Sequence, residues 1–213
     1  MLLNHQTLSD SVASIIRKMI FNGTLKPGER INQVQLAEKM DISRGPIREA
    51  LRLLQNEGLI KHETNKGTFV TTLSRQDQVE IYTLRALLEG EAAKLASKQL
   101  TPSDYHELEE LVESFRKFTL EEDLENLAKI DLEFHKKIVS KCGNARLIKF
   151  HQQLDTQVGA MFLTVANIVP VRINQLVDNH IYLIEALKGQ NEERIKQVFS
   201  EHYKNTLKDL RNN

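Results

Sequence analysis

The chain has 213 residues, of which 40% are hydrophobic and 27% charged, and its formal net charge is zero. This composition is ordinary for a globular protein with one or two hydrophobic cores, and it excludes a chain that is basic throughout in order to coat nucleic acid. Residues 1–73 carry 10 Lys and Arg against 7 Asp and Glu, whereas the remainder carries 19 against 22, so only the N-terminal part has the charge that suits a polyanion.

Two short helices are predicted on either side of Asp41-Ile42-Ser43, which forms a tight turn. Upstream of the turn, Leu36, Ala37 and Met40 share one helical face. Downstream, apolar residues recur at i, i+3, i+4 and i+7, which predicts an amphipathic helix with Ser43 as N-cap and Gly58 at its C-terminal end. The apolar positions are Ile47, Ala50, Leu51 and Leu54.

A second stripe on the same helix consists of Arg44, Arg48 and Arg52, spaced four residues apart. At 100° per residue this stripe lies roughly 100° around the helix from the apolar one. Arginine forms forked hydrogen bonds to phosphate or guanine, so the helix has one face for packing and one for an anion. Spacing alone also permits an ordinary solvated face.

A small hairpin is predicted after this helix. Residues 59–63 and 68–72 have the pattern of short strands, and the loop Thr64-Asn65-Lys66-Gly67 contains the polar residues and the glycine that a hairpin tip requires. A helix-turn-helix followed by a hairpin predicts a winged helix.

These motifs resemble the N-terminal domain of GntR-family bacterial transcription regulators. In that family the residues matching Ser43, Arg44 and Arg48 contact DNA, as does the wing glycine matching Gly67. Some members have an Arg where this chain has Val34, so that contact is not expected here. The resemblance rests on several motifs in the same order: Ile15-Ile16-Arg17, Leu25-Lys26-Pro27-Gly28-Glu29, Leu36-Ala37, Ser43-Arg44-Gly45-Pro46-Ile47-Arg48-Glu49-Ala50-Leu51, Glu57-Gly58-Leu59-Ile60 and Gly67-Thr68-Phe69-Val70.

From residue 74 onward the sequence predicts only helices, with Ser74 as the first N-cap and domains at 1–73 and 74–213. Short connections favour antiparallel neighbours, so we expect a mainly α protein whose second domain is an antiparallel bundle of six helices. The segments are separated by Pro, Gly and Asn, and they run over about 75–98, 102–118, 121–141, 144–167, 171–188 and 191–211.

Four polar residues fall on helix faces that are otherwise apolar. Asp131 and His135 lie one turn apart in the third of these helices, His180 lies in the fifth and His202 in the last. A single histidine on such a face is usually a core residue with its own hydrogen-bond partner. Four polar groups on three helices are instead expected to share a common partner, because unpaired buried polar groups cost about 1–3 kcal/mol each. Three imidazoles and a carboxylate suit zinc, with nickel or manganese as alternatives.

This part of the chain resembles the FCD ligand-binding domain of FadR-like GntR regulators. In FCD domains the residues matching Asp131, His135, His180 and His202 hold a metal ion, and small organic acids are the usual effectors. The chain departs from the family pattern just before His180, where the residue is often acidic and here is Asn179. The matching residues are Leu84-Arg85-Ala86-Leu87-Leu88-Glu89, Asp131, His135, Gly143-Asn144, His180, Ile184, Ala186-Leu187, Gly189 and His202.

Arg85 and Asn144 are candidates for binding an effector carboxylate. Arg85 lies on the apolar stripe of its helix, so it serves either the effector or an internal salt bridge. Asn144 opens a helix and is the weaker candidate, because Asn is also a good N-cap. No partner is expected for His106 or His151.

Localisation follows from what the sequence lacks. The one cysteine, Cys142, excludes an intrachain disulfide and fits a reducing cytosol. The N-terminus has no signal-peptide pattern, and the longest apolar run, 158–171, is too short to span a bilayer. We therefore expect a cytoplasmic protein without a membrane partner.

The sequence thus predicts a homodimeric transcription regulator, not an enzyme, and we expect a repressor. It would bind a pseudo-palindromic operator in double-stranded DNA, with Arg52 and Lys66 adding to the DNA-contacting set. A small carboxylate beside the metal would control DNA affinity. The alternatives are a regulator that senses the metal itself and, less favoured, a metalloenzyme on a helical bundle, against which the absence of a His-Glu-x-x-His motif argues.

Overall fold

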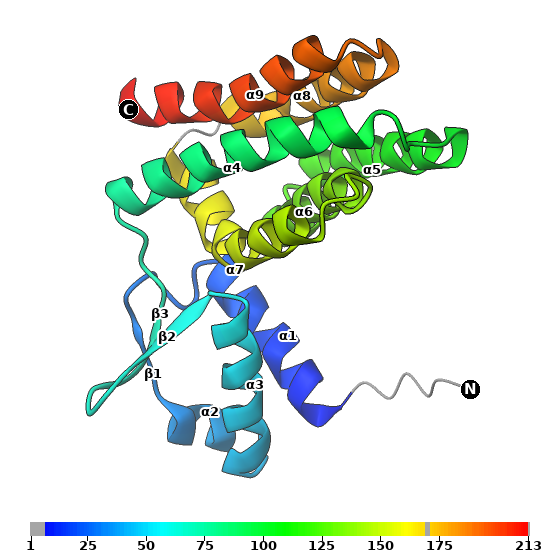
Figure 1. Ribbon diagram of the computed structural model, residues 1–213. Coiled ribbons are helices and arrows are strands. Elements are labelled where there is room, and N and C mark those ends of the chain that lie inside the picture. Colours follow the sequence, from blue (N-terminus) through cyan, green and yellow to red (C-terminus); the bar gives the residue numbers. More distant parts are fainter. Residues whose placement is uncertain (1–6, 169–170, 213) are drawn as a thin grey trace. The chain divides into compact units, whose positions relative to one another are not determined.

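The computed structural model describes residues 7–168 and 171–212, and contacts within it divide the chain into two units at residues 1–72 and 73–213 (Figure 1). In its described part, from residue 7 onward, the first unit contains three helices and a three-stranded antiparallel sheet in the order β1-β3-β2. Its elements are α1 (Leu8–Phe21), β1 (Arg30–Ile31), α2 (Gln33–Lys39), α3 (Arg44–Asn56), β2 (Ile60–Glu63) and β3 (Gly67–Val70).

This first unit is the winged helix that the sequence predicts. The apolar stripe of α3 packs on α1, and Ile47, Ala50 and Leu54 are fully buried. Gly58 follows the C-cap of α3 with φ at +71°, a conformation that glycine adopts without steric cost. The strand β1 was not predicted, because two residues are too few to show an alternating pattern; it forms by pairing Arg30 with Phe69 of β3.

The second unit is the predicted bundle of six helices, so the protein is mainly α in its described residues. These helices are α4 (Arg75–Ala96), α5 (Pro102–Leu120), α6 (Leu124–Ser140), α7 (Ala145–Ile168), α8 (Val171–Lys188) and α9 (Glu192–Asn212).

Helix starts in this unit follow from their caps. Ser74 forms a capping box with Asp77, and Thr101 forms one with Asp104. The helix α6 begins three residues later than expected, because Asp123 caps it by accepting from the backbone N–H of Asn126.

The helices α4 and α9 lie side by side along the bundle (Figure 1). Gly90 lets the two helices pack closely, because an added Cβ would lie 2.4 Å from Ser200 Oγ and 2.9 Å from the backbone oxygen of Lys196. The bundle core is built largely from aromatic and branched aliphatic side chains, including Phe115, Phe134 and Phe199. None of the helices in the described residues is long and apolar enough to cross a membrane.

Candidate metal centre and nucleic-acid interface

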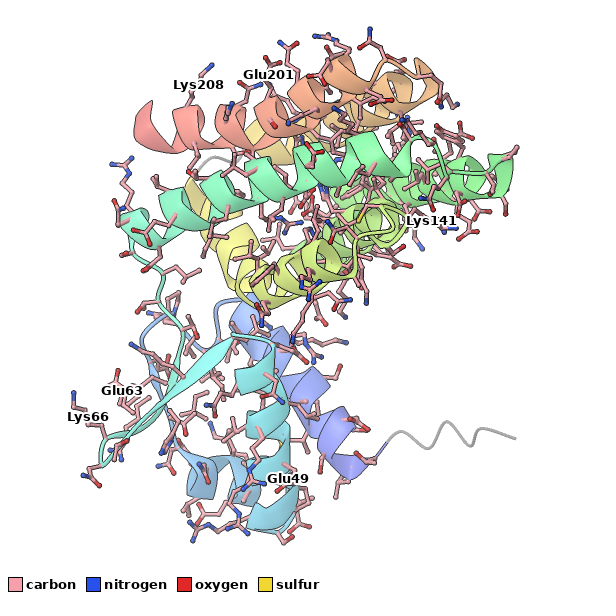
Figure 2. The ribbon with its side chains drawn as sticks, viewed as in Figure 1. Glu49, Glu63, Lys66, Lys141, Glu201 and Lys208 are labelled. Carbon is pink, nitrogen blue, oxygen red and sulfur yellow. The ribbon has the colours of Figure 1, made fainter. Side chains whose placement is uncertain are left out.

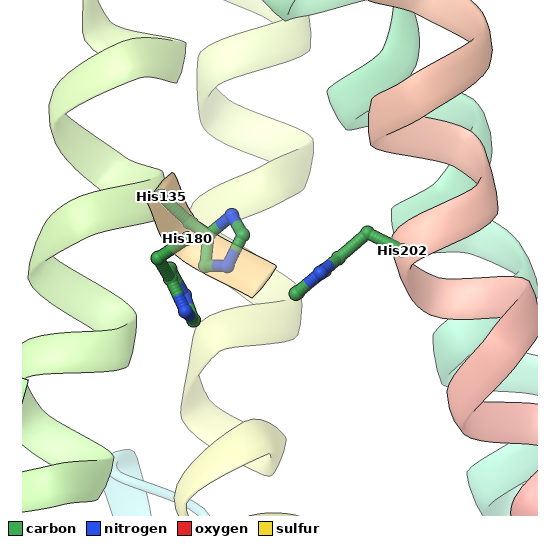
Figure 3. Close-up of side chains that lie close together, drawn as sticks. All are labelled: His135, His180 and His202. Atoms are coloured by element: carbon green, nitrogen blue, oxygen red, sulfur yellow. The ribbon is translucent and has the colours of Figure 1, made fainter. Parts of the chain in front are cut away.

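Three imidazoles from α6, α8 and α9 converge inside the bundle (Figure 3). Each of His135, His180 and His202 offers one nitrogen, and these atoms all lie within 4.8 Å of one another. Around a tetrahedral zinc ion, ligand nitrogens lie about 3.3 Å apart, given Zn–N bonds of about 2.0–2.1 Å. Small side-chain movements are therefore enough to bring the three nitrogens onto one ion.

Asp131 completes the predicted set from the same face of α6. Its Oδ1 atom lies 3.3 Å from His180 Nε2 and 3.9 Å from His135 Nε2. Burial opposes ionisation of Asp131, but its contact with His180 and the neighbouring positive charges outweigh burial and keep the pKa of this carboxyl below its usual value. Asp131 is therefore an anionic donor at neutral pH.

The donor atoms fit a divalent cation. His135 and His180 are completely buried, and their Nε2 atoms have no hydrogen-bond partner in the described structure. Buried polar atoms without partners are rare and costly, and a metal ion would satisfy both of these nitrogens. Burial, followed by repulsion from the other two imidazoles, holds the pKa of His202 well below its usual value, so this ring is in the neutral form that binds metals.

The backbone orients one of these rings. The Nδ1 atom of His180 lies 2.7 Å from the carbonyl oxygen of Leu176, one turn earlier in α8. Because a carbonyl oxygen only accepts, Nδ1 must carry a proton and donate it, so in the neutral, metal-binding form of the ring the lone pair lies on Nε2. The nitrogen left for a metal ion is therefore Nε2, which lies 3.3 Å from Asp131 Oδ1.

Arg85 forms an internal ion pair, one of the two roles that the sequence left open. The guanidinium is fully buried and its Nη2 atom lies 2.6 Å from Glu89 Oε1, with Nε 2.7 Å from the same oxygen. Burial opposes ionisation of Glu89, but the charge of Arg85 outweighs it, so the pKa of this carboxyl lies well below its usual value. Only Nη1 of Arg85 remains without a hydrogen-bond partner, 3.7 Å from Asp155 Oδ1.

The prediction that His151 has no partner is wrong. It is completely buried, and its Nε2 atom lies 2.7 Å from Glu89 Oε1 and 3.3 Å from Arg85 Nη2. Its Nδ1 atom lies 3.5 Å from Asp155 Oδ2. Glu89 and Arg85 precede His151 by 62 and 66 residues, so no local spacing in the sequence could have indicated these contacts.

Asn144 lies apart from this polar cluster. Its side chain is exposed and accepts a hydrogen bond from the backbone N–H of Leu147 at 3.1 Å, which caps α7. This is the role that the sequence favoured for it.

The arginine stripe of α3 is exposed, as a nucleic-acid-contacting face requires. Arg44 and Arg48 make no hydrogen bond or ion pair with any other described residue, whereas Arg52 lies 3.3 Å from Glu49. Ser43 is the N-cap, yet its side chain forms no capping hydrogen bond, so its hydroxyl is available to an external partner.

Lys66 and Glu63 lie together near the tip of the wing (Figure 2). Lys66 is 73% exposed and lies 3.3 Å from Glu63, which also pairs with Lys61. Gly67 has φ at +115°, and an added Cβ would lie 3.0 Å from Nε of Arg30. The Arg30 side chain therefore lies over the glycine backbone. Sequence analysis missed this exposed cation, because β1 itself was not predicted.

Comparison with known proteins places both units in described families. The model "FCD domain" matches residues 80–205, and "Bacterial regulatory proteins, gntR family" matches residues 8–70. The uncharacterized HTH-type transcriptional regulator YdhC of Bacillus subtilis (strain 168) is 33% identical over 199 residues, which cover 92% of this chain and 88% of YdhC. HTH-type transcriptional regulator McbR of Escherichia coli (strain K12) is 27% identical, over 93% and 90% of the two chains. The solved structure of E. coli McbR/YncC aligns with a TM-score of 0.74 at 26% identity and covers 97% of this chain and 98% of its own.

Proposed function

The chain belongs to the GntR family of bacterial regulatory proteins and carries an FCD domain, and on this premise we propose how its DNA binding is controlled. It is a DNA-binding transcriptional regulator of the GntR type and not an enzyme. The metalloenzyme alternative is therefore set aside. We propose that a small organic acid, bound beside a divalent metal in the FCD domain, changes the affinity of a homodimer for its operator, and that the protein acts as a repressor.

In this proposal the N-terminal half of α3 enters the major groove. Arg44 and Arg48 contact base edges or phosphates, Ser43 donates to a phosphate, and Arg52 extends the basic stripe along the helix. At the tip of the wing, Lys66 and the main chain of Gly67 contact the adjacent sugar-phosphate backbone or the minor groove of the DNA. Two copies related by a two-fold axis would contact half-sites about one helical turn apart, roughly 34–36 Å. The exposure of Arg44 and Arg48, without internal partners, supports this assignment.

The metal is held by His135, His180, His202 and Asp131 in the proposal, with zinc as the first choice and nickel or manganese as alternatives. The observation that carries it is the pair of completely buried Nε2 atoms of His135 and His180, which make no hydrogen bond and lie near the Asp131 carboxylate, with the imidazole of His202 beside them. When bound, such an ion supplies positive charge and open coordination positions to an anionic ligand.

Arg85 enters the effector site in a limited role. Because Nε and Nη2 are engaged by Glu89, only Nη1 is free to donate to an effector carboxylate. Asp155, 3.7 Å from Nη1, would compete for the same donor. Burial raises the pKa of Asp155 from its usual value, against the lowering effect of the Arg85 charge. Asn144 is left out of the proposed effector site, because its side chain caps α7.

Binding measurements test the proposal in stages. The purified protein should prefer its selected operator over a random duplex at moderate salt, with an affinity that falls as salt rises. Equal affinity for both duplexes would contradict sequence-specific regulation. A thermal-shift screen of small carboxylates, with and without divalent metal, should yield ligands that stabilise only the metal-loaded protein and alter operator affinity.

The metal-sensing alternative is separated by removing and returning the ion. If metal alone switches operator affinity, the ion is the signal. If metal leaves operator affinity unchanged until a carboxylate is added, the ion anchors the effector. A protein whose operator affinity responds to neither would contradict both forms of control.

A further inference from the structure

We propose that Glu89 is a positioning residue of the metal centre: its carboxylate accepts the Nδ1 proton of His135 and so leaves the Nε2 lone pair of that ring for the metal. This inference rests on the proposed metal site and adds to it a residue from α4, a helix that supplies none of the four ligands. Glu89 is completely enclosed, with a side chain that is 1% exposed.

The two oxygens of Glu89 have different partners. Oε2 lies 2.7 Å from His135 Nδ1. Oε1 accepts from Arg85, lies 2.7 Å from His151 Nε2 and accepts from the Tyr203 hydroxyl at 2.7 Å. The contacts of Oε1 tie the carboxylate to α4, α7 and α9, so that Oε2 is held in place against α6.

The chemistry of the pair fixes the tautomer of His135. A carboxylate can only accept, and a neutral imidazole has a single N–H, so a proton on Nδ1 leaves the lone pair on Nε2. That nitrogen is the one near Asp131, at 3.9 Å. Neither Oε2 nor Nδ1 makes a hydrogen bond to any described group, although the two atoms lie 2.7 Å apart, so each is the nearest candidate to satisfy the other.

The arrangement parallels that of His180 but uses a side chain in place of the backbone. The carbonyl of Leu176 accepts from Nδ1 of His180, and Glu89 takes the same role toward His135. Outer partners of this kind orient metal-binding histidines and raise their basicity. Unlike a backbone carbonyl, Glu89 can be replaced, which makes the idea testable.

The main test compares Glu89→Gln with the wild-type protein in competition with a zinc chelator. We expect zinc affinity to fall about 10- to 100-fold, the usual effect of losing an outer partner. The matched comparison is Tyr203→Phe, which removes one hydrogen bond to Oε1 but keeps the charge of Glu89 and its contact with His135, so its loss of zinc affinity should be smaller than that of Glu89→Gln. An equal loss in the two variants would overturn the assignment of the effect to the contact with His135. Wild-type affinity in a folded Glu89→Gln protein would overturn the proposal.

A second variant guards against loss of the fold. Glu89→Gln leaves the buried guanidinium of Arg85 without its main anionic partner, which is strongly destabilising. The double variant Arg85→Gln/Glu89→Gln removes both charges together. If only this variant folds, the same loss of zinc affinity is expected from it, and wild-type affinity would again overturn the proposal.

Nitrogen-15 NMR of the metal-free protein gives a readout that a purely structural role would not change. In the wild-type protein His135 should carry its proton on Nδ1, and Glu89→Gln should shift that population toward Nε2. A wild-type His135 protonated on Nε2 would overturn the proposal. If the wild-type protein shows the Nδ1 proton but binds no divalent metal, the proposed metal site is wrong, whereas the contact between Glu89 and His135 still holds. The NMR spectrum therefore distinguishes the two failures.

Discussion

Replacing Arg48 by Ala tests whether α3 reads base sequence. The side chain is exposed and makes no ion pair or hydrogen bond within the described structure, while its neighbour Ile47 is fully buried and holds the helix in place. The substitution should therefore leave the unfolding free energy within about 0.5 kcal/mol of the wild-type value.

The expected loss in DNA binding follows from the number of contacts. One good forked contact to a base is worth about 1–3 kcal/mol of discrimination. In the proposed homodimer the change would occur twice, so operator binding should weaken by about 2–6 kcal/mol, or roughly 30-fold to more than 10,000-fold, at about 1.4 kcal/mol per factor of ten.

The assay is fluorescence anisotropy on an operator selected from random duplexes by the wild-type protein, with Arg48→Lys as the matched control. Lysine keeps the charge but loses the fork, so it should retain affinity for random DNA and lose discrimination. If Arg48→Ala weakens operator and random duplexes equally, with a smaller salt slope, Arg48 contacts phosphate and the base-reading argument is wrong.

Three further predictions concern the FCD domain. Protein carrying His135→Ala should contain less than one zinc ion per chain by metal analysis, and its melting temperature in the presence of zinc should fall below that of the wild type. A stoichiometric zinc content would show that His135 is not a metal ligand. Gly90→Ala should cost about 1–3 kcal/mol in chemical unfolding, because its Cβ would meet Ser200 and the backbone of α9, and wild-type stability would show that the two helices can separate freely. Hydrogen bonds from Lys141 and from the capping box lower the pKa of Asp104, so its stabilising contribution is present above the unfolded pKa of about 3.9 and lost as pH falls below it. The stability difference between wild type and Asp104→Asn should therefore be constant above about pH 5 and shrink below pH 4, and a difference independent of pH would refute this role.

Local signals in the sequence were sufficient for the helices and for the centre of the site. The predicted cap Ser74 marks a real helix start, and the helix predicted from residue 102 begins at Pro102, because a helix start is decided by a few neighbouring residues. Helical periodicity likewise put Asp131 and His135 on one face of α6, and the structure brings them beside His180 and His202.

Tertiary structure decided the partners of the buried charges. The sequence puts Arg85 on an apolar stripe with Glu89 one turn later, but only the packed bundle shows that both side chains are enclosed. The position of His151 against Glu89 depends on how α4 and α7 pack, which no spacing along the chain encodes. Periodicity shows which face of a helix a residue occupies; only the packed bundle shows what stands opposite, because hydrogen bonds and ion pairs act over a few ångströms between residues far apart in sequence.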